Sequence, residues 1–216
     1  MKFEAIIFDM DGTLLDTLAD LSDSMNQVLS RFGFPEHSQE AYKYFVGEGM
    51  DVLVRRALPP DQRNDSLVAQ CLQAMREEYV RNWDRTTRPY PGIPELLDAL
   101  SQRKIPMAIL SNKPHDFTRI VADKLLGKWT FPILLGARAS VPKKPDPAGA
   151  LEIAEAFRLP PDKILYLGDT GTDMKTATAA GMFPTGALWG FRTASELTDQ
   201  GARVLVAHPM DLLKYF

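Results

Sequence analysis

Short apolar runs that alternate with helical patterns dominate the chain after residue 90. With a first run that begins at residue 5, they lie at 107–110, 132–137, 163–168, 185–190 and 203–207. Helices are predicted at 115–125 and 147–157, and a third is predicted to end near Gly181. Short unbroken apolar strands between helices are typical of a parallel sheet covered on both faces. The pattern therefore predicts an α/β fold with a doubly wound parallel sheet, whose loop-bearing strand ends share one edge.

Residues 16–88 follow a different pattern, because their apolar residues recur at helical spacing and no strand-like run intervenes. The three helical stretches cover 18–32, 50–57 and 67–79, and Pro59-Pro60 interrupts them. We interpret this segment as an all-helical domain inserted after the first strand. The predicted domains are an α/β core of residues 1–15 and 89–216 and a helical insertion of residues 16–88.

Composition excludes several classes of function. The chain has 216 residues, a net charge of −3 and 45% hydrophobic residues, so it lacks the basic surface expected for a nucleic-acid partner. No apolar run is long enough to span a membrane, and the first residues do not resemble a secretory signal. A single cysteine, Cys71, leaves no internal disulfide. We expect a cytoplasmic protein with no membrane partner, as a monomer or homodimer.

Polar clusters follow four of the predicted strands. They are Asp9, Asp11 and Thr13; Ser111 and Asn112; Lys144; and Asp169 with Asp173. Ligands of open parallel α/β sheets bind beyond the carboxyl ends of the strands. Carboxylates gathered there without Cys or His ligands suit Mg²⁺ better than Zn²⁺. A divalent cation would also offset the cost of ionising Asp9 and Asp11 at the end of a buried strand.

These clusters carry a family resemblance. DMDGTL (9–14), LSN (110–112), KKPDP (143–147) and GDTGTD (168–173) resemble, in order, the four motifs of the haloacid dehalogenase-type phosphohydrolases. VGEGMDVLVRRAL (46–58) and SNKP (111–114) are similar to the phosphoglycolate phosphatases of that family. The resemblance implies a Rossmann-like core with a helical cap. It also implies an Mg²⁺-dependent phosphatase that acts on a small phosphorylated metabolite, 2-phosphoglycolate, through an aspartyl-phosphate intermediate.

The acidic residues are assigned separate roles. Asp9 is expected to attack phosphorus. Asp11 is expected to protonate the leaving oxygen and then to activate water, with its backbone carbonyl on the metal. Asp169 is expected to bind Mg²⁺ through its side chain. Asp173 is expected either to bind the metal, directly or through water, or only to cap its helix.

The remaining core residues are expected to hold the substrate. Ser111, Asn112 and nearby backbone N–H groups are predicted to bind phosphoryl oxygens. Lys144 is predicted to add positive charge there, with Lys143 as the alternative. Thr13 is expected to contact phosphate or to cap the turn.

One loop of the helical insertion is a candidate for substrate selection. Gly47 and Gly49 would let the backbone approach a small ligand. Arg55 or Arg56 would bind a carboxylate, although both arginines could instead lie on a solvated helix face. Glu48 argues against an anionic ligand unless it turns outward or pairs with an arginine.

Several other functions stay open from the sequence. A pyrophosphatase, a nucleotidase or a sugar-phosphate phosphatase or mutase could share this core, because the insertion selects the leaving group. A phosphonoacetaldehyde hydrolase would need a lysine in the insertion, where Lys43 is the candidate. The non-enzyme alternative is a phospho-acceptor switch domain of the receiver type, which needs neither a helical insertion nor Asp11.

Overall fold

The computed structural model describes residues 2–216, and the chain forms two compact units. The α/β unit combines Met1–Leu15 with Pro89–Phe216, and the helical unit is Asp16–Arg88. The chain passes between them in two short paired strands, β2 (Leu15–Asp16) and β3 (Arg88–Pro89). No helix in the described part of the chain is long and apolar enough to cross a membrane.

The α/β unit is built on a six-stranded sheet in the order β5-β4-β1-β6-β7-β8, and its strand pairs are all parallel. The strands are β1 (Ala5–Phe8), β4 (Met107–Pro114), β5 (Ile133–Ala137), β6 (Ile164–Gly168), β7 (Phe183–Ala187) and β8 (Val204–Val206). The four residues of β1 are fully buried, as expected for a central strand with both faces covered.

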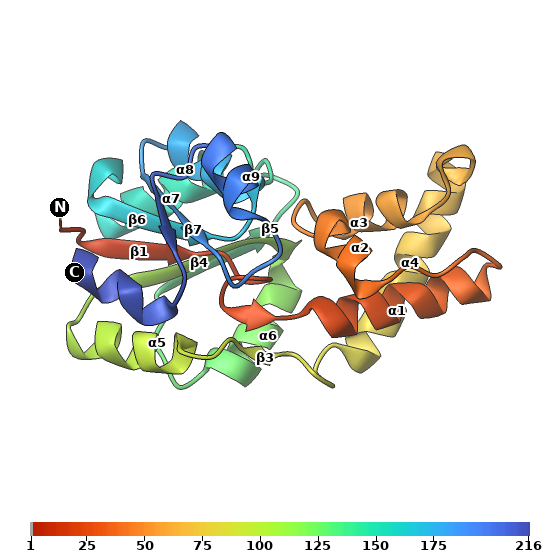
Figure 1. Cartoon of the computed structure of the whole chain (residues 1–216), viewed down its shortest axis with the longest axis horizontal. Coiled ribbons are helices and arrows are strands. Elements are labelled where there is room, and N and C mark those ends of the chain that lie inside the picture. The colour runs from red at the N-terminus through yellow and green to blue at the C-terminus, as the bar shows by residue number, and fades with distance from the viewer. Residues whose placement is uncertain (1) are drawn as a thin grey trace. The chain divides into compact units, whose positions relative to one another are not determined.

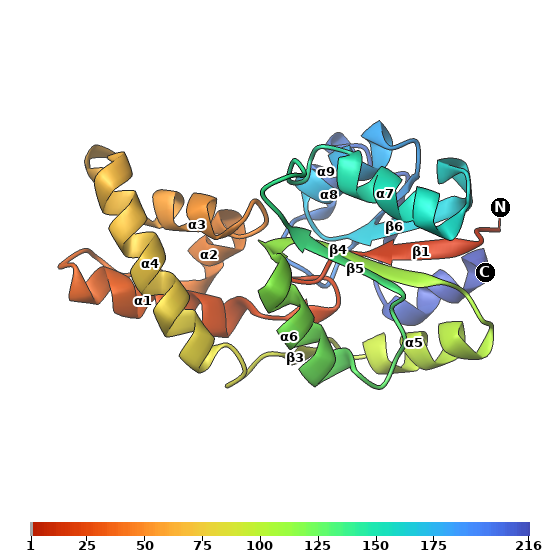
Figure 2. The same cartoon turned by 180° about the vertical axis from the view of Figure 1, so that it is seen from behind.

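Helices cover both faces of this sheet (Figures 1 and 2). One face carries α5 (Ile93–Gln102), α6 (His115–Leu126) and the 3₁₀ helix η3 (Pro209–Tyr215). The other carries α7 (Ala148–Phe157), α8 (Gly171–Ala179) and α9 (Ala194–Asp199), with the short 3₁₀ helix η2 (Pro161–Lys163) leading into β6. The doubly wound parallel sheet predicted from the sequence is confirmed.

Strand β4 is longer than the sequence predicted. The apolar run 107–110 was expected to end before SNKP, but the strand continues to Pro114, and its pairing with β5 is irregular after Leu110. Ser111, Asn112 and Lys113 therefore lie in extended backbone. That placement matters for the site, because neighbouring side chains of an extended segment point to opposite sides.

The helical unit contains four α-helices and a 3₁₀ turn among its described residues. These are α1 (Leu18–Arg31), α2 (Gln39–Phe45), α3 (Met50–Ala57), η1 (Pro60–Gln62) and α4 (Asp65–Asn82). Apolar residues at helical spacing, such as Met25 of α1 and Met75 of α4, are fully buried. This unit has its own apolar core.

A buried carboxylate connects the start of the helical unit to its end. Asp20, near the start of α1 and 2% exposed, accepts hydrogen bonds from the N–H groups and hydroxyls of Thr86 and Thr87, at 2.7–3.1 Å. Burial alone would raise the pKa of Asp20, but these donors lower it below the usual value of an aspartate. The contact ties the first turn of α1 to the segment that follows α4.

Replacing Asp20 should therefore destabilise the protein. Asp20→Ala leaves several donors without an acceptor and should lower the free energy of unfolding by about 3 kcal/mol. The matched control is Asp23→Ala, an exposed position of the same helix, which should change it by less than about 0.5 kcal/mol. Because folding lowers the pKa of Asp20, the contribution is present near neutral pH and declines as pH falls below about 4. Urea denaturation of both variants at two pH values measures the difference, and equal losses would contradict the role.

Candidate active site

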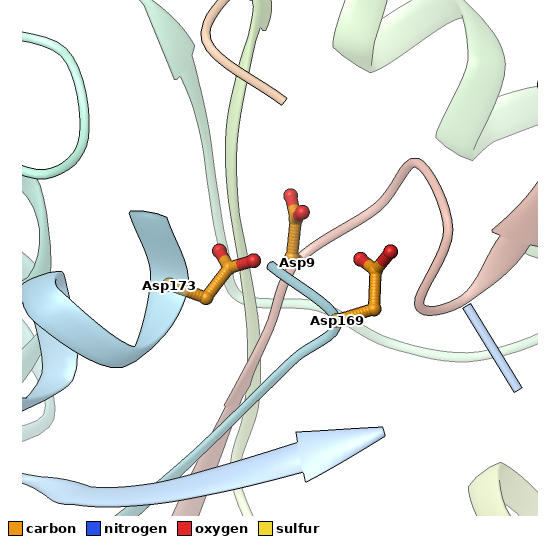
Figure 3. A group of neighbouring side chains, drawn as sticks. All are labelled: Asp9, Asp169 and Asp173. Atoms are coloured by element: carbon orange, nitrogen blue, oxygen red, sulfur yellow. The ribbon is translucent and has the colours of Figure 1, made fainter. Parts of the chain in front are cut away.

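The polar residues selected from the sequence gather at the carboxyl ends of three neighbouring strands. Asp9 follows β1, Ser111 lies near the end of β4, and Asp169 follows β6. Asp173 lies in the first turn of α8, directly after the β6 loop. Figure 3 shows the carboxylates of Asp9, Asp169 and Asp173 turned toward one shared space.

The three carboxylates are close enough to bind one cation. Each of Asp9, Asp169 and Asp173 offers an oxygen, and these oxygens lie within 4.8 Å of one another. All three residues are buried. Space for Asp169 depends on glycines, because a Cβ atom on Gly12 or Gly190 would overlap it. Gly12 also has φ +85°, a conformation that favours glycine.

Asp169 is held in place through both of its oxygens. The Thr13 hydroxyl donates to Oδ1 at 2.9 Å, and the Phe191 N–H donates to Oδ2 at 2.8 Å. The Trp189 indole N–H in turn donates to the Thr13 carbonyl at 2.9 Å. Burial, followed by the charge of Asp173, raises the pKa of Asp169 to about 7. The loop that contains Trp189 and Phe191 was not identified from the sequence.

Lys144 joins two of the carboxylates. Its Nζ lies 2.8 Å from Asp9 Oδ1 and 2.7 Å from Asp173 Oδ1, and its side chain is 2% exposed. Burial opposes an ammonium here, but the charges of Asp173 and Asp9 raise the pKa of Lys144 well above its usual value. Burial and the charge of Asp173 also raise the pKa of Asp9, while Lys144 acts against that shift.

Asn112 fixes the backbone of Lys144. Its Nδ2 donates to the Lys144 carbonyl at 3.0 Å, and its Oδ1 accepts from the Lys144 N–H at 2.9 Å. Asn112 was expected beside Ser111 as a phosphate ligand, and the structure places its amide on the Lys144 loop. Lys143, the alternative to Lys144, is exposed.

Asp173 caps its helix, which is one of the two roles that the sequence left open. Its Oδ2 accepts hydrogen bonds from the N–H and hydroxyl of Thr170, at 3.1 and 2.6 Å, and so forms the capping box of α8. Its Oδ1 accepts from Lys144. Both oxygens of Asp173 therefore already have partners.

Asp11 has a partner that the sequence analysis did not select. Lys113 Nζ lies 3.2 Å from Asp11 Oδ1, and the two side chains are 4% and 14% exposed. The contact is an ion pair without hydrogen-bond geometry. The sequence contains one feature that could have indicated this contact: Lys113 stands two residues after Ser111 in SNKP.

Charge balance favours a divalent cation at this site. The group holds four carboxylates and two ammonium groups, from Asp9, Asp11, Asp169 and Asp173 with Lys113 and Lys144. When all are ionised, negative charge is in excess in a buried place, where it is costly. The donors are carboxylate oxygens, which suit hard cations such as Mg²⁺. The residues present therefore fit a bound divalent metal.

The insertion residues selected from the sequence lie in the helical unit, and they have partners there. Arg55 donates to Asp65 Oδ1 at 2.7 Å and to the Arg63 carbonyl at 3.0 Å. Glu48 pairs with Arg56, one of the two arrangements considered for it. Gly47, in the loop before α3, has φ 122°.

The fold and the site together define an α/β protein with an acidic group suited to a divalent cation at its strand ends. The chain belongs to the haloacid dehalogenase-like hydrolases, because the model of that family matches residues 6–187. It is 30% identical over 209 residues to the phosphoglycolate phosphatase of Aquifex aeolicus, covering 97% of this chain and 94% of the relative. It is also 30% identical to the phosphoglycolate phosphatase of Mannheimia succiniciproducens, covering 99% and 98%.

Solved structures give the same result. A crystal structure of a protein from Lactobacillus delbrueckii subsp. bulgaricus superposes with a TM-score of 0.92 at 30% identity, over 98% of this chain and 97% of the other. A predicted phosphoglycolate phosphatase from Haemophilus somnus has a TM-score of 0.91 at 27% identity, over 99% and 98%. The family resemblance stated from the four motifs is confirmed.

The raised pKa of Asp169 predicts a pH-dependent response to metal. The folded value of about 7 lies above the ordinary 3.8, so the metal-free protein should lose stability as pH rises from about 4 to about 7. Metal ligation needs ionised carboxylates, so the stabilisation by Mg²⁺ should grow over the same range. Melting temperatures with Mg²⁺ and with chelator, measured from about pH 5 to pH 8, test this. Asp169→Asn should remove most of the Mg²⁺ effect, and a Mg²⁺ effect that is larger at pH 5 would contradict the assignment.

Proposed function

We propose that the protein is an Mg²⁺-dependent phosphatase that hydrolyses a small phosphomonoester, with 2-phosphoglycolate as its substrate. The observation that carries the proposal is the cluster of Asp9, Asp169 and Asp173 around Lys144 at the strand ends of a haloacid dehalogenase-like fold. Relatives named phosphoglycolate phosphatase that align over nearly the whole chain support the choice of substrate. The α/β unit would be the catalytic core and the helical unit the cap.

Asp9 is the proposed nucleophile. The Met10 N–H and Lys144 hold its Oδ1 at 2.7 and 2.8 Å, so the carboxylate has a fixed orientation. In the first step an Asp9 oxygen forms a bond to phosphorus and the bond from phosphorus to the leaving oxygen breaks. The products of that step are an alcohol and an aspartyl phosphate on Asp9.

Asp11 is the proposed acid and base. The contact with Lys113 is an ion pair, so Asp11 must take up a proton before the first step. It then gives that proton to the leaving oxygen, so that an alcohol leaves rather than an alkoxide. In the second step its carboxylate takes a proton from the water that attacks phosphorus. The bond between phosphorus and the Asp9 oxygen breaks, which releases inorganic phosphate and restores the Asp9 carboxylate and the protonated Asp11.

Several residues would hold the cation and the phosphoryl group. Asp9, Asp169 and the backbone carbonyl of Asp11 are the proposed ligands of Mg²⁺. Asp173 would act through water, because its Oδ1 is paired with the Lys144 ammonium and its Oδ2 caps α8, whereas the donors to Asp169 are uncharged. The cation supplies charge neutralisation for the phosphoryl oxygens. The hydroxyl of Ser111 and the Lys144 ammonium would contact those oxygens, whereas the Thr13 hydroxyl already donates to Asp169.

A substrate screen tests the proposal. Phosphate release would be measured with Mg²⁺ over 2-phosphoglycolate, pyrophosphate, nucleotides and sugar phosphates, and compared as kcat/KM. The highest value is expected for 2-phosphoglycolate. A clear preference for pyrophosphate or for a nucleotide would refute 2-phosphoglycolate as the substrate but would leave the assignment as a phosphatase in place. No phosphate release from any compound would refute both the substrate and the phosphatase activity.

Two conservative variants separate the roles of the aspartates. Asp9→Asn should abolish turnover, because an amide is not a nucleophile for phosphorus. Asp11→Asn should lose about 10²–10⁴-fold on an alkyl phosphate, but should still form the aspartyl phosphate from p-nitrophenyl phosphate, whose leaving group needs no proton. Steady-state turnover and rapid-quench bursts measure the two effects. Normal turnover by Asp9→Asn would refute the assignment.

A further inference from the structure

Lys113 is a buried lysine of the site to which the mechanism above gives no role. It lies near the end of β4 with a side chain that is 4% exposed. Its Nζ lies 3.2 Å from Asp11 Oδ1 and 5.5 Å from the centre of the Phe117 ring. The ammonium is therefore enclosed on the same side of the site as the proposed acid.

The backbone around Lys113 is fixed by local hydrogen bonds. Its N–H donates to the Ser111 hydroxyl at 3.2 Å, and the Thr118 hydroxyl donates to its carbonyl at 3.1 Å. Asn112, between Ser111 and Lys113, turns instead to the Lys144 backbone. One short segment of β4 thus places an ammonium beside Asp11 and uses Asn112 to hold the Lys144 loop.

Lys113 offsets part of the excess negative charge of the site, but folding stability alone gives little further reason for a lysine at this position. A buried ion pair usually contributes no more to folding than well-packed apolar side chains of similar size. The charge of Asp9 is already matched by Lys144, at 2.8 Å. Lys113 adds a second buried cation beside Asp11, where the leaving group is expected.

We propose that Lys113 is a specificity-determining residue, whose ammonium binds a carboxylate carried by the leaving alcohol. This inference rests on the proposed function, because it takes Asp11 as the group that contacts the leaving oxygen. Lys113 lies one ion-pair distance beyond that group. The substrate class is then a phosphomonoester with an anionic group close to the ester oxygen.

The dimensions agree with a short substrate. An acid lies about 3 Å from the oxygen that it protonates, and Lys113 Nζ lies 3.2 Å from an oxygen of that acid. Asp11 Oδ1 is buried, so the other oxygen, about 2 Å away, is the one open to the leaving group, and the ammonium lies at most about 8 Å from the leaving oxygen. A carboxylate attached through one carbon extends about 3 Å of that way, so it can approach the ammonium when the substrate points toward Lys113. Three N–H donors allow Lys113 to contact Asp11 and the substrate carboxylate together.

The test compares two phosphonates that cannot be hydrolysed. In 3-phosphonopropionate a methylene replaces the ester oxygen of phosphoglycolate, and propylphosphonate has the same chain without the carboxylate. Titration calorimetry in the presence of Mg²⁺ measures the affinity of the protein for each phosphonate, and the ratio of the two affinities is compared between variants. The wild type is expected to favour 3-phosphonopropionate by at least about tenfold. Lys113→Met should bring that ratio close to one, and Lys113→Arg should retain part of it.

Arg55→Met is the matched control, because Arg55 is the carboxylate ligand expected from the sequence. It should keep the wild-type ratio. Circular dichroism checks that each variant is folded, and Lys113→Gln replaces Lys113→Met if the latter is not. A wild-type ratio that persists in the folded Lys113 variant, or that is lost only in Arg55→Met, would overturn the inference.

The proposed function is measured separately. Hydrolysis of p-nitrophenyl phosphate by the wild type with Mg²⁺ reports on the phosphatase activity without a carboxylate in the substrate. If this activity is present but the wild type binds both phosphonates equally, carboxylate recognition by Lys113 is refuted and the phosphatase stands. If no phosphomonoester is hydrolysed, the proposed function itself fails.

Discussion

The ion pairs of Lys144 with Asp9 and Asp173 are the contacts on which the rest of the site depends. Three carboxylates lie within 4.8 Å of one another in a buried place, an arrangement that raises the cost of ionising each. Lys144 offsets part of that repulsion at 2.8 and 2.7 Å. Asn112 holds the backbone of Lys144 in place through two hydrogen bonds. The remaining negative charge is what makes the site suitable for a divalent cation.

The fold supplies this arrangement with few residues. A parallel sheet brings the ends of β4, β1 and β6 next to each other, so side chains far apart in the sequence meet without long loops. Gly12 and Gly190 have no Cβ atom, and the space that a Cβ would take at either position is occupied by Asp169. Asp173 caps α8 and also accepts a hydrogen bond from Lys144. The same carboxylate therefore orients a helix and the Lys144 ammonium. A position of this kind tolerates little change, because two structural tasks share one side chain.

The sequence predicted the parallel sheet well, because buried strands such as Ala5–Phe8 are local and unbroken in their apolar pattern. It did not predict the extension of β4 to Pro114, because the polar residues of SNKP give no apolar signal. The loop with Trp189 and Phe191 was missed for a different reason. Its contacts with Thr13 and Asp169 join residues 176 and 22 positions apart, and nothing local in the loop indicates them. Lys113 was missed because a lysine in a motif is indistinguishable from a solvated one until its burial is known.

The two candidate anion-binding side chains, Arg55 of the helical unit and Lys113 of the α/β unit, differ in how far they are exposed to water. The ion pair of Arg55 with Asp65 has side chains that are 47% and 93% exposed, and such pairs contribute at most about 1 kcal/mol. That pair does not prevent Arg55 from binding another anion, but in water the arginine discriminates weakly between anionic and neutral ligands. Lys113 is 4% exposed, and an ammonium shielded from water interacts more strongly with a nearby charge. A buried cation beside the proposed acid is therefore the better basis for selecting a small anionic leaving group.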